Sequence, residues 1–131
     1  MVQEVRHLFF TSQEIVDALD AYRGMHEAFL PSGDITLKGV AKDGAVRVEV
    51  RMVYGVRVQL AVFDIAANDV LRALICACRG LGIPLPKEGK KSLSGSAAGV
   101  ALKIKVDIAT RSVGNMVQLD TFETARQLEA S

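Results

Sequence analysis

The sequence contains few of the residues that most often mark a catalytic or binding site. Among its 131 residues there is no tryptophan, there are two histidines, two cysteines and three prolines, and aromatic residues make up 5%. Cys76 and Cys78 lie two positions apart in a stretch with helical character, so their side chains point about 200° apart on a helix. They therefore neither bridge each other nor share a metal, and we expect no disulfide framework.

Charge of one sign and long apolar runs are also lacking. The formal net charge is +1 and the isoelectric point is about 7.8, whereas a dedicated nucleic-acid domain usually has a value above about 9. The most apolar helical stretch, residues 70–78, is too short to span a bilayer. Residues 1–10 lack the basic region and cleavage site of a signal peptide. We expect no membrane segment and a cytoplasmic location.

No motif indicates catalysis, a metal or a cofactor. Residues 84–92 differ from a phosphate-binding loop because Pro84 stands where the first glycine is needed and a second lysine precedes Ser92. His7 and His26 have no acidic residue or cysteine near them at metal-ligand spacing. The sequence therefore predicts no catalytic residue, no bound metal and no cofactor.

Two stretches are predicted to be helical. Thr11 and Glu14 have the spacing of a capping box, and the apolar residues after them recur on one face. The second stretch, from about residue 68 to residue 79, is apolar nearly all round and is interrupted only by Arg72 and Arg79. Such a helix must be covered on nearly every side, either by its own domain or by a second subunit.

Alternation of apolar and polar residues predicts strands at residues 46–52, 56–62 and 100–108. The apolar phase of the first strand continues through Gly55 into the second. This favours a three-residue loop at residues 53–55, with one long strand bent at Gly55 as the alternative. Period two with one polar face is typical of an antiparallel sheet covered on one side. The predicted core face carries Val46, Val48, Val50, Met52, Val56, Val58, Leu60, Val62, Val100, Leu102, Ile104, Val106 and Ile108.

The sequence matches itself when it is shifted by 55 residues. The shift places apolar and acidic positions of residues 14–31 on equivalent residues in 69–86, and one further residue aligns residues 46–50 with 102–106. A shorter match begins at residue 114. These matches indicate a unit of strand, helix, strand and strand that occurs twice.

We therefore predict an α+β fold in which two imperfect β-α-β-β repeats form a largely antiparallel sheet with the helices on one face, plus a short C-terminal helix. A single domain is expected over residues 1–131. Its repeats are predicted at about residues 1–54 and 56–109, with a partial repeat at 112–131.

Two functional hypotheses follow, and the first is a non-enzymatic interaction or assembly module that self-associates. It rests on the apolar second helix, the open sheet and the C-terminal segment. The expected partners are further copies of the chain or another protein. The candidate interface residues are Leu71, Ile75, Cys78, Phe122 and Leu128.

The second hypothesis is binding of an anion or a nucleic-acid backbone by basic residues that share the polar side of the sheet, together with the loop at residues 87–91. The sequence places no aromatic residue among them to stack on a base. Nucleic acid is therefore limited to backbone contacts and is not the favoured partner. The candidate residues are Lys87, Lys90, Lys91, Arg47, Arg51, Arg57, Lys103 and Lys105.

Overall fold

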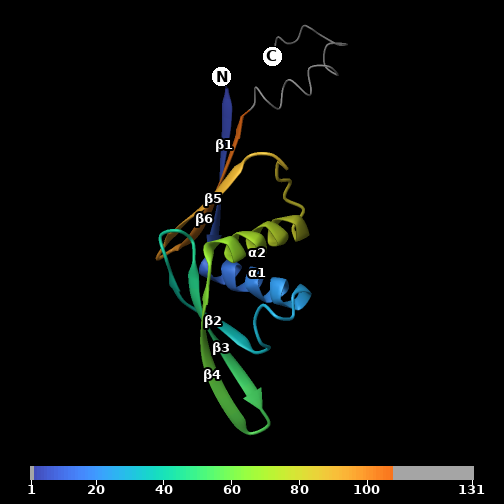
Figure 1. Cartoon of the computed structure of the whole chain (residues 1–131), viewed down its shortest axis with the longest axis vertical. Helices are drawn as coiled ribbons and strands as arrows, with labels where there is room; N and C mark the ends of the chain where they lie inside the picture. Colours follow the sequence, from blue (N-terminus) through green and yellow to red (C-terminus); the bar gives the residue numbers. More distant parts are fainter. Residues whose placement is uncertain (1, 108–131) are drawn as a thin grey trace.

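A computed structural model describes residues 2–107, which form two helices and two three-stranded antiparallel sheets (Figure 1). The predicted α+β class is confirmed. The predicted partial repeat at 112–131 and the C-terminal helix with Phe122 and Leu128 lie outside the described residues. The elements are β1 (Gln3–Thr11), α1 (Ser12–Met25), β2 (Asp34–Val40), β3 (Val46–Tyr54), β4 (Arg57–Ile65), α2 (Ala67–Gly80), β5 (Lys90–Ser96) and β6 (Gly99–Asp107).

The strands form two sheets, so the prediction of one shared sheet is wrong. Sheet A has the order β1-β6-β5 and joins the first strand of the chain to the last two, whereas sheet B has the order β2-β3-β4. Each sheet is built on a central strand whose two neighbours occupy both of its edges. In Figure 1 the sheets extend in opposite directions from α1 and α2, which lie side by side on one side of them.

The first helix starts at the predicted capping box. The Thr11 hydroxyl accepts a hydrogen bond from the Glu14 backbone N–H (3.3 Å), and the Glu14 carboxylate accepts one from the Thr11 N–H (2.9 Å). This arrangement satisfies two amides that have no partner inside the helix. The buried face of α1 consists of Ile15, Ala18, Leu19 and Tyr22.

The second helix buries a single stripe, although its sequence is apolar nearly all round. Ala66 precedes it and provides no side-chain cap. The buried residues are Val70, Ala73, Leu74 and Cys78, at the spacing of one helix face. Leu71 and Ile75 are only half-buried. The core thus covers part of α2 and leaves other apolar groups partly accessible.

One connected core lies beneath both sheets. The predicted alternation of the two central strands is confirmed, because every second residue is buried from Val46 to Met52 in β3 and from Val100 to Val106 in β6, and the residues between them are not. The helices supply the other half of this core. Its strand residues are Val46, Val48, Val50, Met52, Val100, Leu102, Ile104 and Val106.

The two sheets touch where β5 passes the turn between β2 and β3. The Gly95 N–H donates a hydrogen bond to the Lys42 carbonyl (2.9 Å). A Cβ atom on Gly95 would collide with the backbone of Ala41, and one on Gly44 would collide with Leu93. Glycine is therefore required on both sides of this contact. At Gly95 the neighbouring backbone is too close for a side chain, and at Gly44 the Leu93 side chain fills the space and φ is 95°.

Candidate interaction surfaces

Strand β4 lies in the opposite phase to the predicted one. Gly55 and Val56 form a two-residue turn, so Tyr54 pairs with Arg57 and Met52 pairs with Gln59. Gly55 has φ 64°, as expected for the first central residue of a type II′ hairpin turn. The predicted three-residue loop is therefore wrong. The core-facing residues are Ala61, Phe63 and Ile65, and the residues assigned to the core, Val58, Leu60 and Val62, face outward.

Because β4 has the opposite orientation to the predicted one, a row of its apolar side chains lies on the outside of the protein. Val58, Leu60 and Val62, which we call the outer row of β4, are 51%, 57% and 58% exposed. Val53 lies opposite Val58 on β3 and is also exposed. Because β4 is an edge strand of sheet B, this row lies beside backbone groups that no strand among residues 2–107 pairs with. Such an edge is suited to pairing with another chain.

Two of the cations beside this row are paired with carboxylates, whereas Arg51, which lies opposite Leu60, takes part in none of the ion pairs formed within residues 2–107. Arg47 donates hydrogen bonds to both carboxylate oxygens of Asp64 (2.6 and 3.1 Å), and Lys38 lies 3.8 Å from Glu49. The hydrogen bond with Asp64 raises the pKa of Arg47. The same hydrogen bond from Arg47 holds the pKa of the Asp64 carboxyl below its ordinary value. The outer face of sheet B is therefore an apolar row beside two cations that are paired, Arg47 and Lys38, and one that is not.

The predicted basic face is divided by the formation of two sheets. Arg47 and Arg51 lie on the outer face of sheet B, whereas Arg57 lies on the other face of that sheet with Gln59. Lys103 and Lys105 belong to sheet A, so they do not share a surface with the arginines. The eight candidate cations thus do not form one site.

Three of the candidate lysines do come together, on the outer face of sheet A. Lys105 lies directly opposite Lys90 of β5, and Lys103 is two residues away on the same face of β6. Lys91 points to the opposite face, where it lies opposite Ile104, and Lys87 lies in the exposed loop before β5. The predicted lysine loop is therefore split between two faces.

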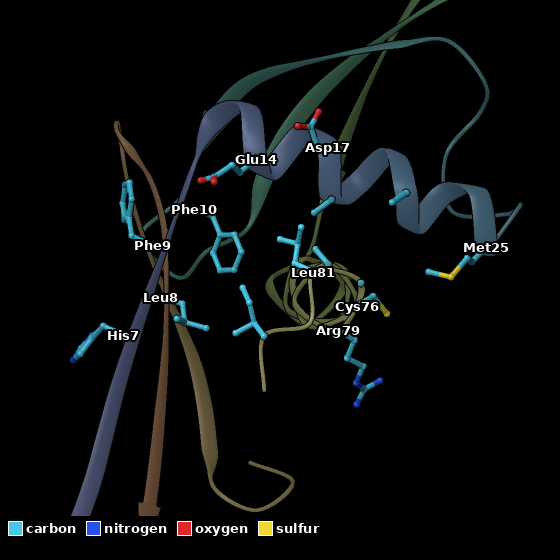
Figure 2. Close-up of a pocket in the computed structure, with 15 residues that line it drawn as sticks. His7, Leu8, Phe9, Phe10, Glu14, Asp17, Met25, Cys76, Arg79 and Leu81 are labelled. Carbon is cyan, nitrogen blue, oxygen red and sulfur yellow. The ribbon is translucent and has the colours of Figure 1, made fainter. Parts of the chain in front are cut away.

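The first strand adds two residues to this face that the sequence did not associate with it. His7 lies directly opposite Lys103, and Phe9 lies opposite Ala101. In Figure 2 both side chains point away from the helices, whereas Leu8 and Phe10 point toward them. Their pairing depends on contact between the two ends of the described chain, which no local pattern reveals. We define the basic face of sheet A as His7, Phe9, Lys90, Lys103 and Lys105.

An apolar groove of about 1110 Å³ lies on the other side of β1, between this strand, α1, the end of α2 and the loop that follows it (Figure 2). Leu8, Phe10, Met25, Leu81 and Ile83 line it together with alanines of both helices. Its acidic side chains are engaged locally, because Glu14 caps α1, as described above, and Asp17 accepts a hydrogen bond from Gln13 (2.9 Å). The groove therefore offers mainly apolar contact.

The candidate interface residues of α2 lie in or near the core. Cys78 is 0% exposed, and its burial raises the pKa of its thiol. It therefore has no surface to offer a partner in this fold. Leu71 and Ile75 are both half-buried, and Leu71 packs against the core. Cys76 lines the apolar groove. Phe122 and Leu128 lie outside the described residues.

Among residues 2–107, no group of histidine, cysteine and acidic side chains is arranged to hold a metal ion. Within the same residues, neither helix is long and apolar enough to cross a membrane. Comparisons of the chain with protein-family models, with curated proteins and with solved structures gave no match. The surfaces described above are therefore the basis for the functional argument.

Proposed function

We propose that this protein is a non-enzymatic interaction module that self-associates by pairing β4 with β4 of a second copy. The observation that carries the proposal is the outer row of β4 on an edge strand. Three neighbouring outward side chains are apolar and more than half exposed there. Burial of apolar surface and completion of the strand's backbone hydrogen bonds would both favour a partner strand at this edge.

A comparison of the four edge strands supports this choice. β2 and β5 have seven residues each, β2 carries a register shift beside Lys38, and β5 begins with two lysines. β1 carries Glu4 and Arg6. Short length, irregular register and charge are the features that keep an edge from pairing with another chain. β4 has nine residues and no charged side chain between Arg57 and Asp64, so it lacks these protections.

The outer row is also symmetric about its middle residue. If two β4 strands pair antiparallel with Leu60 opposite Leu60, Val58 of each copy lies opposite Val62 of the other. Each such apolar cross-strand pair stabilises a sheet by roughly 0.2–1 kcal/mol. The product is a two-fold symmetric dimer with a continuous six-stranded sheet, because the same residues contribute from both sides.

The element order supports the further proposal that the chain contains two copies of one unit. β1-α1-β2-β3 is followed by β4-α2-β5-β6, and β1 takes the same place beside the central strand of sheet A that β4 takes in sheet B. We extend the proposal to a cytoplasmic location. The location is supported by free Cys76 and Cys78, which suit a reducing compartment.

Light scattering coupled to gel filtration tests self-association. We expect a concentration-dependent dimer that Leu60→Lys converts to a monomer, because a charge in the centre of the row would be buried against its own copy. Thr36→Lys is the matched control, since Thr36 is exposed on the outer face of the opposite edge strand. A monomer at high micromolar concentration, or a dimer unaffected by Leu60→Lys, would refute the proposal.

Cysteine cross-linking tests the register. Directly opposed residues of antiparallel strands have Cα atoms about 4.5–5.5 Å apart, within the range of a disulfide. Leu60→Cys should therefore form a covalent dimer under mild oxidation. Val58→Cys alone should not, because its neighbour across the axis is Val62. The unchanged chain controls for Cys76 and Cys78, and efficient cross-linking by Val58→Cys would contradict the register.

A further inference from the structure

Like charges are directly opposed on the outer face of sheet A. Lys90 and Lys105 are Cα partners in the β5–β6 pair, and both side chains are exposed on that face. Opposed charges of the same sign destabilise a strand pair. Among the ion pairs formed within residues 2–107, none involves Lys90, Lys103 or Lys105. The arrangement is thus unfavourable for the isolated fold and favourable for an anion held between the lysines.

The basic face of sheet A carries one acidic side chain, Asp107, at its far end. Asp107 pairs with Gln3, one row beyond the pair formed by Val5 and Lys105. The three lysines therefore outnumber the carboxylate within a patch of about 10 Å by 20 Å, given the spacing of three strands and of the four rows from Asp107 to Ala101. In sheet B, by contrast, two of the outward cations, Arg47 and Lys38, are paired with carboxylates, and among the described strands Arg51 is the exception.

An aromatic side chain lies in the same patch. Phe9 is 54% exposed on a sheet face, and Figure 2 shows it on the side of β1 that is turned away from the helices, as is His7. Ser92 and Ser94 complete the rows of Lys103 and Ala101 on β5. Cations, an exposed aromatic ring and hydroxyl groups on one open sheet face are the elements with which proteins hold unpaired nucleotides.

We propose that the basic face of sheet A binds single-stranded nucleic acid. Lys90, Lys103 and Lys105 contact phosphates, and Phe9 stacks on a base. A single strand fits better than a duplex, because only unpaired bases expose a face to a ring on a flat sheet. An acidic peptide would satisfy the lysines and leave Phe9 without a role. This inference is independent of the β4 interface, which lies on the other sheet.

Fluorescence polarisation with a labelled single-stranded oligonucleotide, measured from 50 to 200 mM salt, tests the proposal. Three phosphate contacts on a single strand predict a slope of about −2 in log affinity against log salt. The Kd should therefore rise about twentyfold across this range. Lys103→Gln removes one contact and should make the slope shallower by about 0.7. No binding at 50 mM salt would overturn the proposal.

Two matched controls separate this face from net charge and from aromatic content. Lys103→Glu should weaken binding strongly, whereas Arg57→Glu changes the net charge equally beside the β3–β4 turn of sheet B and should leave affinity nearly unchanged. Phe9→Ala should weaken binding about fivefold or more with the salt slope preserved. Tyr54→Ala removes an exposed ring from sheet B and should have little effect.

Three results would overturn the inference even if binding is observed. Equal weakening by Arg57→Glu and Lys103→Glu would show that only the net charge matters. Equal affinity for a duplex of the same length would remove the stacking role of Phe9. Competition by poly-glutamate as effective as that by unlabelled single strand would show that the face holds acidic chains by charge alone. Retained secondary structure in circular dichroism confirms that each variant is folded.

A stability measurement gives a second readout on the same lysines. Lys105→Glu replaces a repulsive pair with Lys90 by an attractive one, so the melting temperature should rise while oligonucleotide affinity falls. A structural role for Lys105 would instead lower both. A melting temperature that falls together with the affinity would therefore contradict the proposed role.

Discussion

Sheet A and sheet B have the same construction and opposite outer surfaces. Each consists of three antiparallel strands, and alternate residues of the central strand are buried. On its outer face, sheet A has an exposed Phe9 and three lysines that form no ion pair with any of residues 2–107. The outer face of sheet B has the apolar outer row of β4 and charges that are mostly paired. Both core faces must be apolar because they are buried against the helices, and they are therefore alike. Folding does not impose the same composition on the outer faces, so we attribute the difference between them to different partners.

The two sheets also differ in the burial of one leucine in each. Leu102 of β6 is fully buried, and Leu60 of β4 is more than half exposed. Leu102→Ala should lower the free energy of unfolding by about 2–5 kcal/mol through lost contacts and an unfilled cavity. Leu60→Ala should change it by less than about 0.5 kcal/mol when measured below the dimerisation concentration. Urea denaturation of both variants would reveal an error in the assigned phase of β4 if Leu60→Ala proved equally costly.

The contact between the sheets can be broken at one glycine. Gly95→Ala places a methyl group against the Ala41 backbone and threatens the hydrogen bond to Lys42. We expect a loss of about 1–3 kcal/mol in the free energy of unfolding, as for other overpacked sites. Gly39→Ala is the control, because nothing lies within 4 Å of its added Cβ atom. Thermal or urea unfolding measures both, and similar values for the two variants would contradict the described contact.

The smallest effect concerns the ion pair of sheet B. Arg47 lowers the pKa of Asp64 in the folded state, so the pair contributes stability above the ordinary carboxyl pKa of about 4. That contribution is lost as the pH falls from about 4 through the lower folded pKa. Asp64→Asn should therefore destabilise slightly at neutral pH and should match the unchanged chain in strong acid. Arg47→Gln should give the same pH profile of unfolding, and a constant difference between pH 7 and pH 2 would contradict it.

Local signals in the sequence predicted local structure well. The capping box formed by Thr11 and Glu14 is present, and the strands around Val48 and Leu102 bury the predicted faces. Each of these features depends on residues within a few positions of one another. The turn between β2 and β3 also depends on near neighbours, since the Asp43 carboxylate accepts a hydrogen bond from the Ala45 N–H (3.0 Å).

The features that the sequence did not predict depend on register and on distant pairing. β4 has apolar residues on both faces, so periodicity alone could not choose between Leu60 and Phe63 for the core. The choice follows from the turn at Gly55 and from the covered end of sheet B, where Phe63 packs against the core. The pairing of β1 with β6 likewise divided the predicted basic face and placed Phe9 beside the lysines of sheet A.

The pairing of β1 with β6 also sets an order of events during synthesis. All of sheet B lies within residues 34–65, so its strands can pair as soon as that segment has left the ribosome. β1 emerges first, yet its partner is the last described strand, with Gln3 opposite Asp107. Closing so long a loop is slow compared with forming a hairpin. Among the strands of residues 2–107, β1 therefore waits longest for its neighbour and has the greatest need of protection while the chain is being made.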